Sequence, residues 1–260
     1  MIHLLIIDGL NMVRRIYSAL PVGDNDTPDI QHFLNACDNA FKHILELHQP
    51  SHAVCVFEHY TSTWRHQLYP PYKANRKPQP EAMLASFPSL REILEKHSIS
   101  WLDIEGYEAD DIIASIVHTT RAHDCRNLIL STDHLMAQLL DAKTQLYDHF
   151  NHKPIDHSTI LKRYDVTPEQ LPDYFALAGS NSVNVPGIAG VGAKTAANLL
   201  AEFNHCQALI NAEQLPAKTA NRLQGTEHAI YLYRALFTLR RDCPINGNLK
   251  EWRVTSGKNT

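Results

Sequence analysis

The sequence lacks several features that would place the protein in a special class. No apolar run approaches membrane-spanning length, and the first residues do not form a signal-peptide pattern. The 5 cysteines (Cys37, Cys55, Cys125, Cys206 and Cys243) have no paired spacing, which argues against a disulfide framework. We therefore expect a cytoplasmic protein with no membrane partner.

A strong positive charge is also missing. The net charge is −4, so any surface that binds nucleic acid would have to be local. What remains is an ordinary globular composition. The 260 residues are 44% hydrophobic and 20% charged, which is sufficient for one large domain or two small ones.

Strand-like runs that end at a carboxylate recur along the first half of the chain. Residues 3–7 lead to Asp8, residues 53–57 lead to Glu58, and residues 127–132 lead to Asp133. Two further strand-like stretches cover 99–104 and 144–147, and helical patterns cover 11–20, 31–47, 81–96 and 110–122, with another helix beginning at 135–140. This alternation predicts a parallel, doubly wound α/β sheet. Because ligands gather at the carboxyl ends of parallel strands, the three acids are expected to share one edge.

A cluster of three carboxylates opens the helix at 110–122. Glu108, Asp110 and Asp111 precede a buried stripe formed by Ile112 and its neighbours. The helix dipole favours acids at this end, but three so close together repel one another, and a hard cation relieves that repulsion. An acidic first turn alone would explain the cluster equally well. Acids delivered by three other segments favour a site for Mg²⁺ or Mn²⁺.

Residues 60–80 form a polar stretch in which cations alternate with aromatic side chains. Trp64, Tyr72, Lys73 and Arg76 are examples, and four prolines oppose regular structure. This composition suits a phosphate backbone and stacked bases. A solvated loop with a few anchoring aromatics would account for it equally well.

From about residue 156 the pattern changes to helices with short connections, and a glycine-rich turn lies at 185–196. It is not a P-loop, because Ala193 separates the last glycine from Lys194, and its glycine order differs from the dinucleotide fingerprint. Glycines before a helix let its free N–H groups approach a phosphate. The turn therefore favours a helix–hairpin–helix that grips a DNA backbone without reading bases; a plain glycine-rich turn is the alternative. The tail from 247 is expected to be poorly ordered.

Several motifs together resemble the 5′-nuclease, or flap endonuclease, family. They are Asp8-Gly9, Phe57-Glu58, Tyr72-Lys73-Ala74-Asn75-Arg76, Gly106-Tyr107-Glu108-Ala109-Asp110-Asp111, Ser131-Thr132-Asp133 and the run from Pro186 to Thr195. Their order and spacing match the family from about residue 3 to 245. The resemblance implies a PIN-like core at 1–160 with an arch at about 59–95, a helix–three-turn–helix DNA-binding module at 161–250 and a tail at 251–260. We expect a monomer.

The resemblance also implies roles for individual residues. Mg²⁺ (or Mn²⁺) would be held by Asp8, Glu58, Glu108, Asp110, Asp111 and Asp133, with Asp110 at the catalytic centre. Lys73 and Arg76 would stabilise the transition-state phosphate, and Tyr72 would stack on the DNA. A K⁺ ion would lie on the backbone carbonyls of Leu177, Ala178, Pro186, Ile188 and Val191. Duplex phosphates would meet Gly190, Val191, Gly192, Ala193, Lys194 and Thr195.

The sequence also departs from the family pattern. Active relatives carry acids where this chain has Leu135, Ser180 and Val183, and Glu58 replaces an Asp. These losses predict a weak second metal site. The favoured function is a Mg²⁺-dependent endonuclease that cuts DNA near a 5′ flap or junction, and the alternative is a DNA-structure-binding protein with little or no turnover. A haloacid-dehalogenase-like phosphohydrolase is disfavoured, because Leu10 stands where that class needs a second Asp.

Overall fold

A six-stranded sheet forms the centre of the protein in the computed structural model, which describes residues 2–22, 27–59 and 61–255. The strands are β1 (Ile2–Asp8), β2 (His52–Val56), β3 (Ser100–Leu102), β4 (Cys125–Leu130), β5 (Thr144–Asp148) and β6 (Lys153–Pro154). Their order is β3-β2-β1-β4-β5-β6. The first five strands are parallel, as predicted, whereas β6 pairs antiparallel with β5 at one edge.

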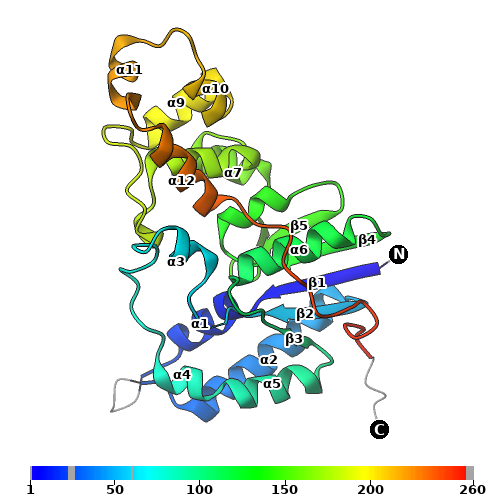
Figure 1. The fold of residues 1–260 in the computed structure, drawn as a ribbon. Coiled ribbons are helices and arrows are strands. Elements are labelled where there is room, and N and C mark those ends of the chain that lie inside the picture. Colours follow the sequence, from blue (N-terminus) through cyan, green and yellow to red (C-terminus); the bar gives the residue numbers. More distant parts are fainter. Residues whose placement is uncertain (1, 23–26, 60, 256–260) are drawn as a thin grey trace.

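Both faces of the sheet are covered (Figure 1). One face packs against α1 (Gly9–Ala19), α2 (Ile30–His48), α4 (Glu81–Ala85) and α5 (Phe87–Lys96). The other packs against α6 (Ala109–Thr120) and the helices that follow. Neighbouring residues of β1 point to opposite faces of the sheet. Leu5 packs in the core under α1, α2, α4 and α5, and Leu4 packs in the core under α6. A strand that is buried on both sides is apolar throughout, which is why residues 3–7 form a continuous hydrophobic run.

Local rules explain where the predicted elements differ from the observed ones. The expected helix at 81–96 breaks at Ser86, because Pro88 has no N–H for the helical ladder and its ring crowds the preceding turn. A short helix, α3 (Trp64–Leu68), forms inside the proline-containing stretch, where Thr63 and His66 make a capping box before the first proline. Residues 134–139 form a 3₁₀ helix rather than an α-helix.

The second half of the chain builds a helical module at one end of the sheet (Figure 1). Its helices are α7 (His157–Tyr164), α8 (Leu171–Ala178), α9 (Ala193–Phe203), α10 (Cys206–Ile210), α11 (Ala217–Leu223) and α12 (Glu227–Phe237), with 3₁₀ turns at Pro168–Gln170 and Asn181–Val183. Apolar residues of α6, α8, α9 and α12 belong to one continuous core. None of the helices in the described part of the chain is long and apolar enough to cross a bilayer.

The predicted tail is partly wrong. Trp252 is buried, and its carbonyl accepts the N–H of Ala53 at 2.8 Å, while Arg253 forms an isolated bridge with His52. Indole burial and backbone pairing at the sheet edge therefore hold residues 251–255 against the core. Residues 256–260 of that prediction lie outside the described residues.

Candidate metal centre and DNA-binding turn

Four carboxylates from separate segments line one cavity of about 550 Å³. Asp8 ends β1, Glu58 follows β2, Asp110 lies in the first turn of α6, and Asp133 follows β4. The parallel sheet brings these segments together, because its strands all end at the same edge. The structure thus gathers the acids that the sequence pattern placed at strand ends.

Asp8 is held in a fixed position at the bottom of this group. Its side chain is 6% exposed and caps α1 by accepting the Asn11 N–H at 3.2 Å, and its other oxygen accepts the Ser131 hydroxyl at 2.7 Å. Burial raises the pKa of Asp8 to about 6; the two hydrogen bonds oppose this rise, and repulsion from Asp133 and Glu58 adds to it. The two hydrogen bonds orient the carboxylate, which forms no ion pair within the described part of the chain.

Asp110 has no direct partner of this kind, although the charge of Lys73 acts on it from a distance and opposes the rise of its pKa. It makes no hydrogen bond or ion pair with any other described residue. Burial, followed by repulsion from Asp133 and Asp8, raises its pKa well above the usual range. In the described part of the chain, no three acids, histidines or cysteines are already arranged to hold a metal ion. Mutual repulsion is the physical reason that carboxylates without a cation stay apart, and oxygen donors of this kind suit Mg²⁺ or Mn²⁺.

Asp111 does not belong to this group, contrary to the prediction. It is fully buried, and it accepts four hydrogen bonds: from Arg65 Nη1 at 2.6 Å, Arg65 Nη2 at 2.8 Å, Trp64 Nε1 at 2.8 Å and the Arg240 N–H at 3.0 Å. A carboxylate has about four acceptor positions, so none is left for a metal. Consecutive residues of a helix point in different directions, which sends Asp110 to the cavity and Asp111 to the ion pair.

Glu108 lies between these two environments. Its side chain is 2% exposed and is bound by Lys73 Nζ, by Arg65 Nη1 at 3.0 Å and by the Tyr72 hydroxyl at 3.1 Å. Burial disfavours its charge, but Lys73 and Arg65 outweigh that effect and lower the pKa of Glu108. Glu108 is therefore ionised and already paired with cations, unlike Asp110.

Tyr72 is not available for base stacking in this geometry, which corrects another prediction. It borders the cavity but is only 5% exposed, and its ring packs with Val185, Leu236 and Phe237. The apolar surroundings of the ring and the bond from its hydroxyl to Glu108 explain why it turns inward. Tyr72 anchors the chain rather than presenting a free aromatic face.

Residues 71–76, which we call the strap, lie across the edge of the cavity. Lys73 N–H donates to Val183 O at 2.9 Å, the Asn75 amide to Asn181 O at 2.6 Å, and Arg76 Nε to Ser182 O at 3.1 Å. Lys73 and Arg76 line the cavity, as do Arg14, Arg15 and Lys77. The predicted arch cations are thus beside the carboxylates. Arg14 and Arg15 of α1 also lie beside these carboxylates, which the sequence pattern did not reveal.

The glycine-rich turn brings two backbone segments unusually close. A Cβ on Gly187 would lie 2.4 Å from the Gly179 nitrogen, and one on Gly179 would lie 2.5 Å from the Pro186 oxygen. Both glycines have positive φ, which other residues adopt at a cost. Ile188 N–H donates to Leu177 O at 2.8 Å across this contact. The carbonyls expected to hold K⁺ therefore come from the two segments that meet at this contact: the end of α8 (Leu177 and Ala178) and the glycine-rich turn (Pro186, Ile188 and Val191).

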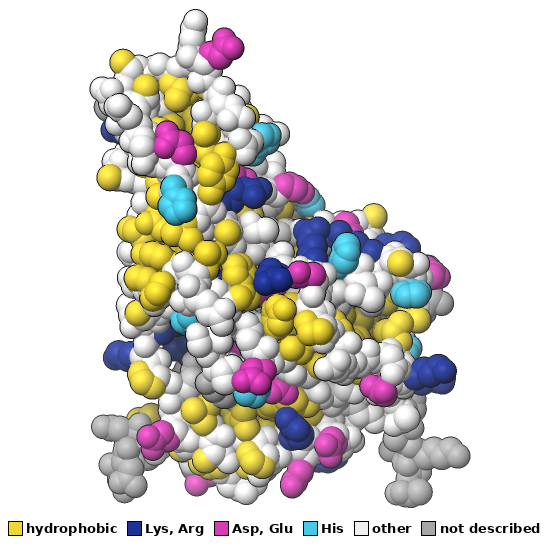
Figure 2. All heavy atoms as spheres, in the orientation of Figure 1, with side chains coloured by type: hydrophobic (Ala, Val, Ile, Leu, Met, Phe, Trp, Pro, Cys, Tyr) yellow, Lys and Arg dark blue, Asp and Glu magenta, His cyan; other side chains and the backbone are white. Residues whose placement is uncertain are grey.

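After the turn, the amino end of α9 is open to solvent. Gly190, Gly192, Ala193 and Lys194 are exposed, and α9 has no side-chain cap on its first N–H groups. Free N–H groups at a helix start bind anions. On the face drawn in Figure 2, Lys and Arg side chains stand in small separate groups among acidic and apolar ones.

Comparison with known families decides the assignment. The model described as "5′-3′ exonuclease, N-terminal resolvase-like domain" matches residues 3–165, and "5′-3′ exonuclease, C-terminal SAM fold" matches residues 166–260. The chain belongs to the 5′-3′ exonuclease family. This confirms the resemblance noted in the sequence and the predicted fold class.

Curated relatives match along almost the whole length of this family member. It is 36% identical over 258 residues to Flap endonuclease Xni of Photorhabdus laumondii, covering 98% of this chain and 99% of that one. It is 35% identical over 257 residues to the protein of the same name from Serratia proteamaculans, again covering 98% and 99%.

Solved structures share the fold. A T5 5′-exonuclease with bound zinc superposes with a TM-score of 0.75 at 23% identity, over 90% of this chain and 89% of that one. The catalytic core of Rad2 in complex with DNA substrate superposes with a TM-score of 0.57 at 14% identity, over 93% and 80%. At these identities the likeness concerns the fold alone.

Three positions where the resemblance noted in the sequence leads us to expect acids lie together in this family member. Leu135, Ser180 and Val183 all line the cavity beside the carboxylates. Val183 also packs against the cluster that contains Tyr72, and its carbonyl accepts the strap. On this side of the cavity the chain therefore supplies an apolar contact and a backbone bond where a carboxylate is expected from the family pattern.

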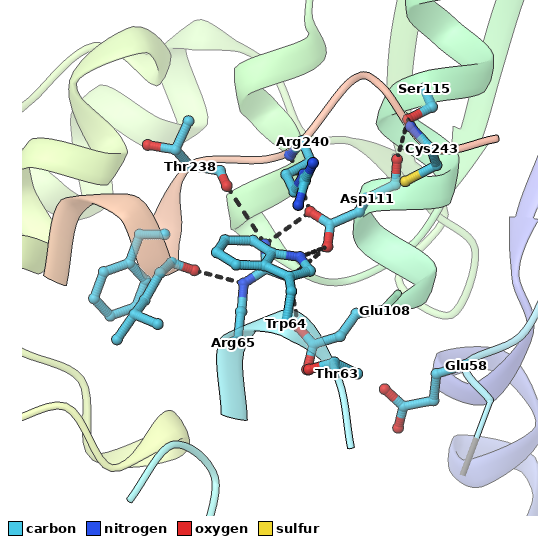
Figure 3. A network of polar contacts seen from close by, with 12 residues as sticks. Glu58, Thr63, Trp64, Arg65, Glu108, Asp111, Ser115, Thr238, Arg240 and Cys243 are labelled. Carbon is cyan, nitrogen blue, oxygen red and sulfur yellow. Dashed lines mark hydrogen bonds and ion pairs between the residues drawn. The ribbon is translucent and has the colours of Figure 1, made fainter. Parts of the chain in front are cut away.

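Sequence reasoning missed the importance of Arg65. Figure 3 shows its guanidinium between Asp111 and the chain that follows α12, with Trp64 stacked beside it and Glu58 standing apart. The side chain is 1% exposed. It lies in a polar, basic stretch that looks solvated, so a single sequence offered no signal for burial.

Proposed function

We propose that the protein is a structure-specific 5′ flap endonuclease that hydrolyses phosphodiesters of DNA near a 5′ single-strand/duplex junction. The observation that carries this proposal is the gathering of four carboxylates from four segments in a cavity edged by the cations of the strap. Relatives named Flap endonuclease Xni, 36% and 35% identical over nearly the full chain, support it. Such acids would repel a DNA phosphate unless a cation stood between them.

The residues fit a divalent cation, Mg²⁺ or Mn²⁺. Asp8, Asp110, Asp133 and Glu58 would hold it, and Glu108 would join them when the cation displaces Lys73, which is then free to bind a phosphate. Burial and like-charge repulsion raise the pKa of Asp8 to about 6 and hold that of Asp110 well above its usual range, and a bound cation would reverse both shifts. When bound, the cation supplies Lewis acidity toward the phosphodiester and an activated water. A T5 5′-exonuclease of the same fold carries zinc, which agrees with a divalent ion here.

The remaining chemistry falls to the chain's own cations. Lys73 and Arg76 would bind the scissile phosphate and stabilise the charge that develops on its oxygens. The strap that carries them is held to residues 181–183 by the Lys73 N–H and by the side chains of Asn75 and Arg76. Lys73 Nζ would leave Glu108, and Arg76 Nε would leave Ser182 O, to bind the phosphate. Leu135, Ser180 and Val183 offer no carboxylate, and the protein would rely on one strong metal site rather than two.

The module beyond the cavity would hold the duplex. The exposed start of α9 and Lys194 would contact phosphates without reading sequence. A K⁺ ion on the carbonyls of Leu177, Ala178, Pro186, Ile188 and Val191 would add positive charge to the turn. The close approach of the Gly179 and Gly187 backbones supports this arrangement.

One assay tests the function. The intact protein and an Asp110→Ala variant are incubated with a 5′-flap DNA and Mg²⁺, and the products are mapped. We expect cleavage near the junction by the parent and a loss of at least about 100-fold in the variant, as for removal of a metal ligand. Equal cleavage by both would assign the activity to a contaminant. Tight junction binding without any turnover would instead establish a DNA-structure-binding protein.

A further inference from the structure

The buried guanidinium of Arg65 has every one of its five N–H groups satisfied. Its bonds are Nε to Leu236 O at 2.8 Å, Nη1 to Glu108 Oε2 at 3.0 Å and Asp111 Oδ2 at 2.6 Å, and Nη2 to Asp111 Oδ1 at 2.8 Å and Thr238 O at 3.4 Å. An arginine offers five donors in a rigid fork, so a complete set of this kind fixes the position of each partner.

These bonds join three segments that are far apart in the sequence (Figure 3). Arg65 comes from α3, the two carboxylates come from the start of α6, and the two carbonyls come from the end of α12 and the residue after it. Residues 238–243, which we call the return segment, then run back along α6. Arg240 N–H donates to Asp111 Oδ1 at 3.0 Å, and Cys243 N–H donates to Ser115 Oγ at 3.0 Å.

Glu108 is the point where this network meets the cavity. Arg65 holds its Oε2, while its Oε1 is bound by Lys73, a cavity residue. Rotation of the Glu108 carboxylate would break the bond to Arg65. Oε2 also accepts the Tyr72 hydroxyl at 3.1 Å, so the orientation of Oε1 toward the cavity edge is set jointly by Tyr72, which lines the cavity, and by Arg65, which does not.

We propose that Arg65 is a positioning residue that couples the return segment, and with it α12, to the Glu108 carboxylate. α12 packs along α8, whose end opens the glycine-rich turn, so the DNA-binding module and the metal-binding edge are fastened together at Arg65. The part that concerns metal binding by Glu108 rests on the function proposed above.

An Arg65→Lys variant tests the coupling, because lysine keeps the charge but offers three donors instead of five. Two readouts that need no cleavage are measured on the full chain: Mn²⁺ affinity without DNA, and labelling of Cys243 by a thiol reagent, located by mass spectrometry. Cys243 is buried in the parent. We expect Mn²⁺ affinity to fall about 10–100-fold, as for loss of a ligand-orienting group, and Cys243 labelling to accelerate about 10-fold.

A second variant loosens the return segment without touching Arg65 or Glu108. Ser115→Ala removes the hydroxyl that receives the Cys243 N–H. We expect faster Cys243 labelling and a weaker Mn²⁺ affinity, by about 3–10-fold, because the Ser115 hydroxyl joins Cys243 of the return segment to the Asp111 carbonyl in the first turn of α6. The matched control is Arg91→Lys: Arg91 also lies over a tryptophan, at 4.7 Å from the Trp101 ring, and pairs with Asp103, but it is 53% exposed. It should change neither readout.

The outcomes separate this inference from the proposed function. If Arg65→Lys is less stable but binds Mn²⁺ like the parent, Arg65 is only structural and the inference is wrong. A loss of Mn²⁺ affinity in Arg65→Lys without faster Cys243 labelling also overturns the inference. So does an Arg65→Lys variant that does not fold, if Ser115→Ala then behaves like the parent in both readouts. If both readouts change as expected while the parent cuts no flap DNA, the inference stands and the endonuclease proposal fails.

Discussion

At the scale of single residues, the Asp110 carboxylate lowers the free energy of unfolding of the metal-free protein. Burial and repulsion from Asp133 and Asp8 raise its pKa, so its ionised form opposes folding at neutral pH. We predict that Asp110→Asn, which removes the charge and keeps the shape, increases the free energy of unfolding by roughly 0.5–2 kcal/mol. It should also abolish most flap cleavage.

The free energy of unfolding is measured by chemical denaturation in EDTA at pH 7.5. The control is a variant of Asp38, an acid whose pKa is lowered rather than raised. Asp38 bonds to Lys96 and His97, and the Lys96 hydrogen bond leads the effects that lower its pKa. Asp38→Asn should therefore destabilise the protein slightly. If Asp110→Asn proves less stable than the parent in EDTA, the repulsion argument is incorrect.

The neighbours Asp110 and Asp111 mark the limit of what a sequence reveals at this scale. Asp8, Glu58 and Asp133 could be placed together because parallel strands end at one edge. The sequence could not show that Asp110 faces the cavity while Asp111 is paired. That difference depends on Arg65, which comes from another segment and neutralises Asp111. Tyr72 was misjudged for the same reason: its burial depends on Val185 and Phe237, which are more than a hundred positions away.

At the scale of elements, the start of α9 gives a test of the DNA-binding turn. Lys194 is exposed in the first turn and makes no hydrogen bond or ion pair within the described ranges. We predict that Lys194→Ala lowers affinity for duplex DNA and reduces the slope of log affinity against log salt by about 1, as for one lost phosphate contact. The free energy of unfolding should stay within about 0.5 kcal/mol.

Binding is measured by fluorescence anisotropy at several salt concentrations, with Lys42→Ala as the control. Lys42 is 66% exposed on α2 and pairs only with Glu46 at 3.9 Å. Its loss should leave the salt slope unchanged. Identical slopes for the parent and Lys194→Ala would count against a phosphate contact at this helix start.

Strands and helices were predicted correctly where the hydrophobic pattern alone decides them. They were predicted wrongly where one residue, such as Pro88 or Trp252, changes the local structure. The apolar runs ending at Asp8 and Asp133 gave the parallel sheet correctly, because buried strands must be hydrophobic on both faces. The helix expected at 81–96 was wrong because Pro88 interrupts its ladder. The tail prediction was partly wrong because one indole, that of Trp252, is buried against the core and holds residues 251–255 there.

At the scale of the whole molecule, a histidine away from the cavity links stability to pH. Burial, together with repulsion from His152, His43 and His48, lowers the pKa of His149 to about 4, while Asp148 opposes the change. Its Nδ1 is buried without a hydrogen-bond partner. The ordinary pKa of a histidine in an unfolded chain is about 6.5. Between these values the unfolded chain binds the additional proton, so the contribution of His149 to stability is complete above pH 6.5 and is lost as the pH falls toward 4.

We therefore predict that lowering the pH from 7.5 to 5 reduces the melting temperature of the parent relative to that of His149→Gln, while protonation of Asp8 and Asp110, whose pKa values are raised, acts in the opposite direction in both proteins. Both are measured in EDTA, so that metal binding does not contribute. The control is His228→Gln, because His228 is exposed on α12. An equal fall in the parent and in His149→Gln would mean that the acid sensitivity of the fold arises elsewhere. A smaller fall in His149→Gln alone would show that the half-buried position of His149, against His43 of α2 and just after β5, contributes to the acid sensitivity of the fold.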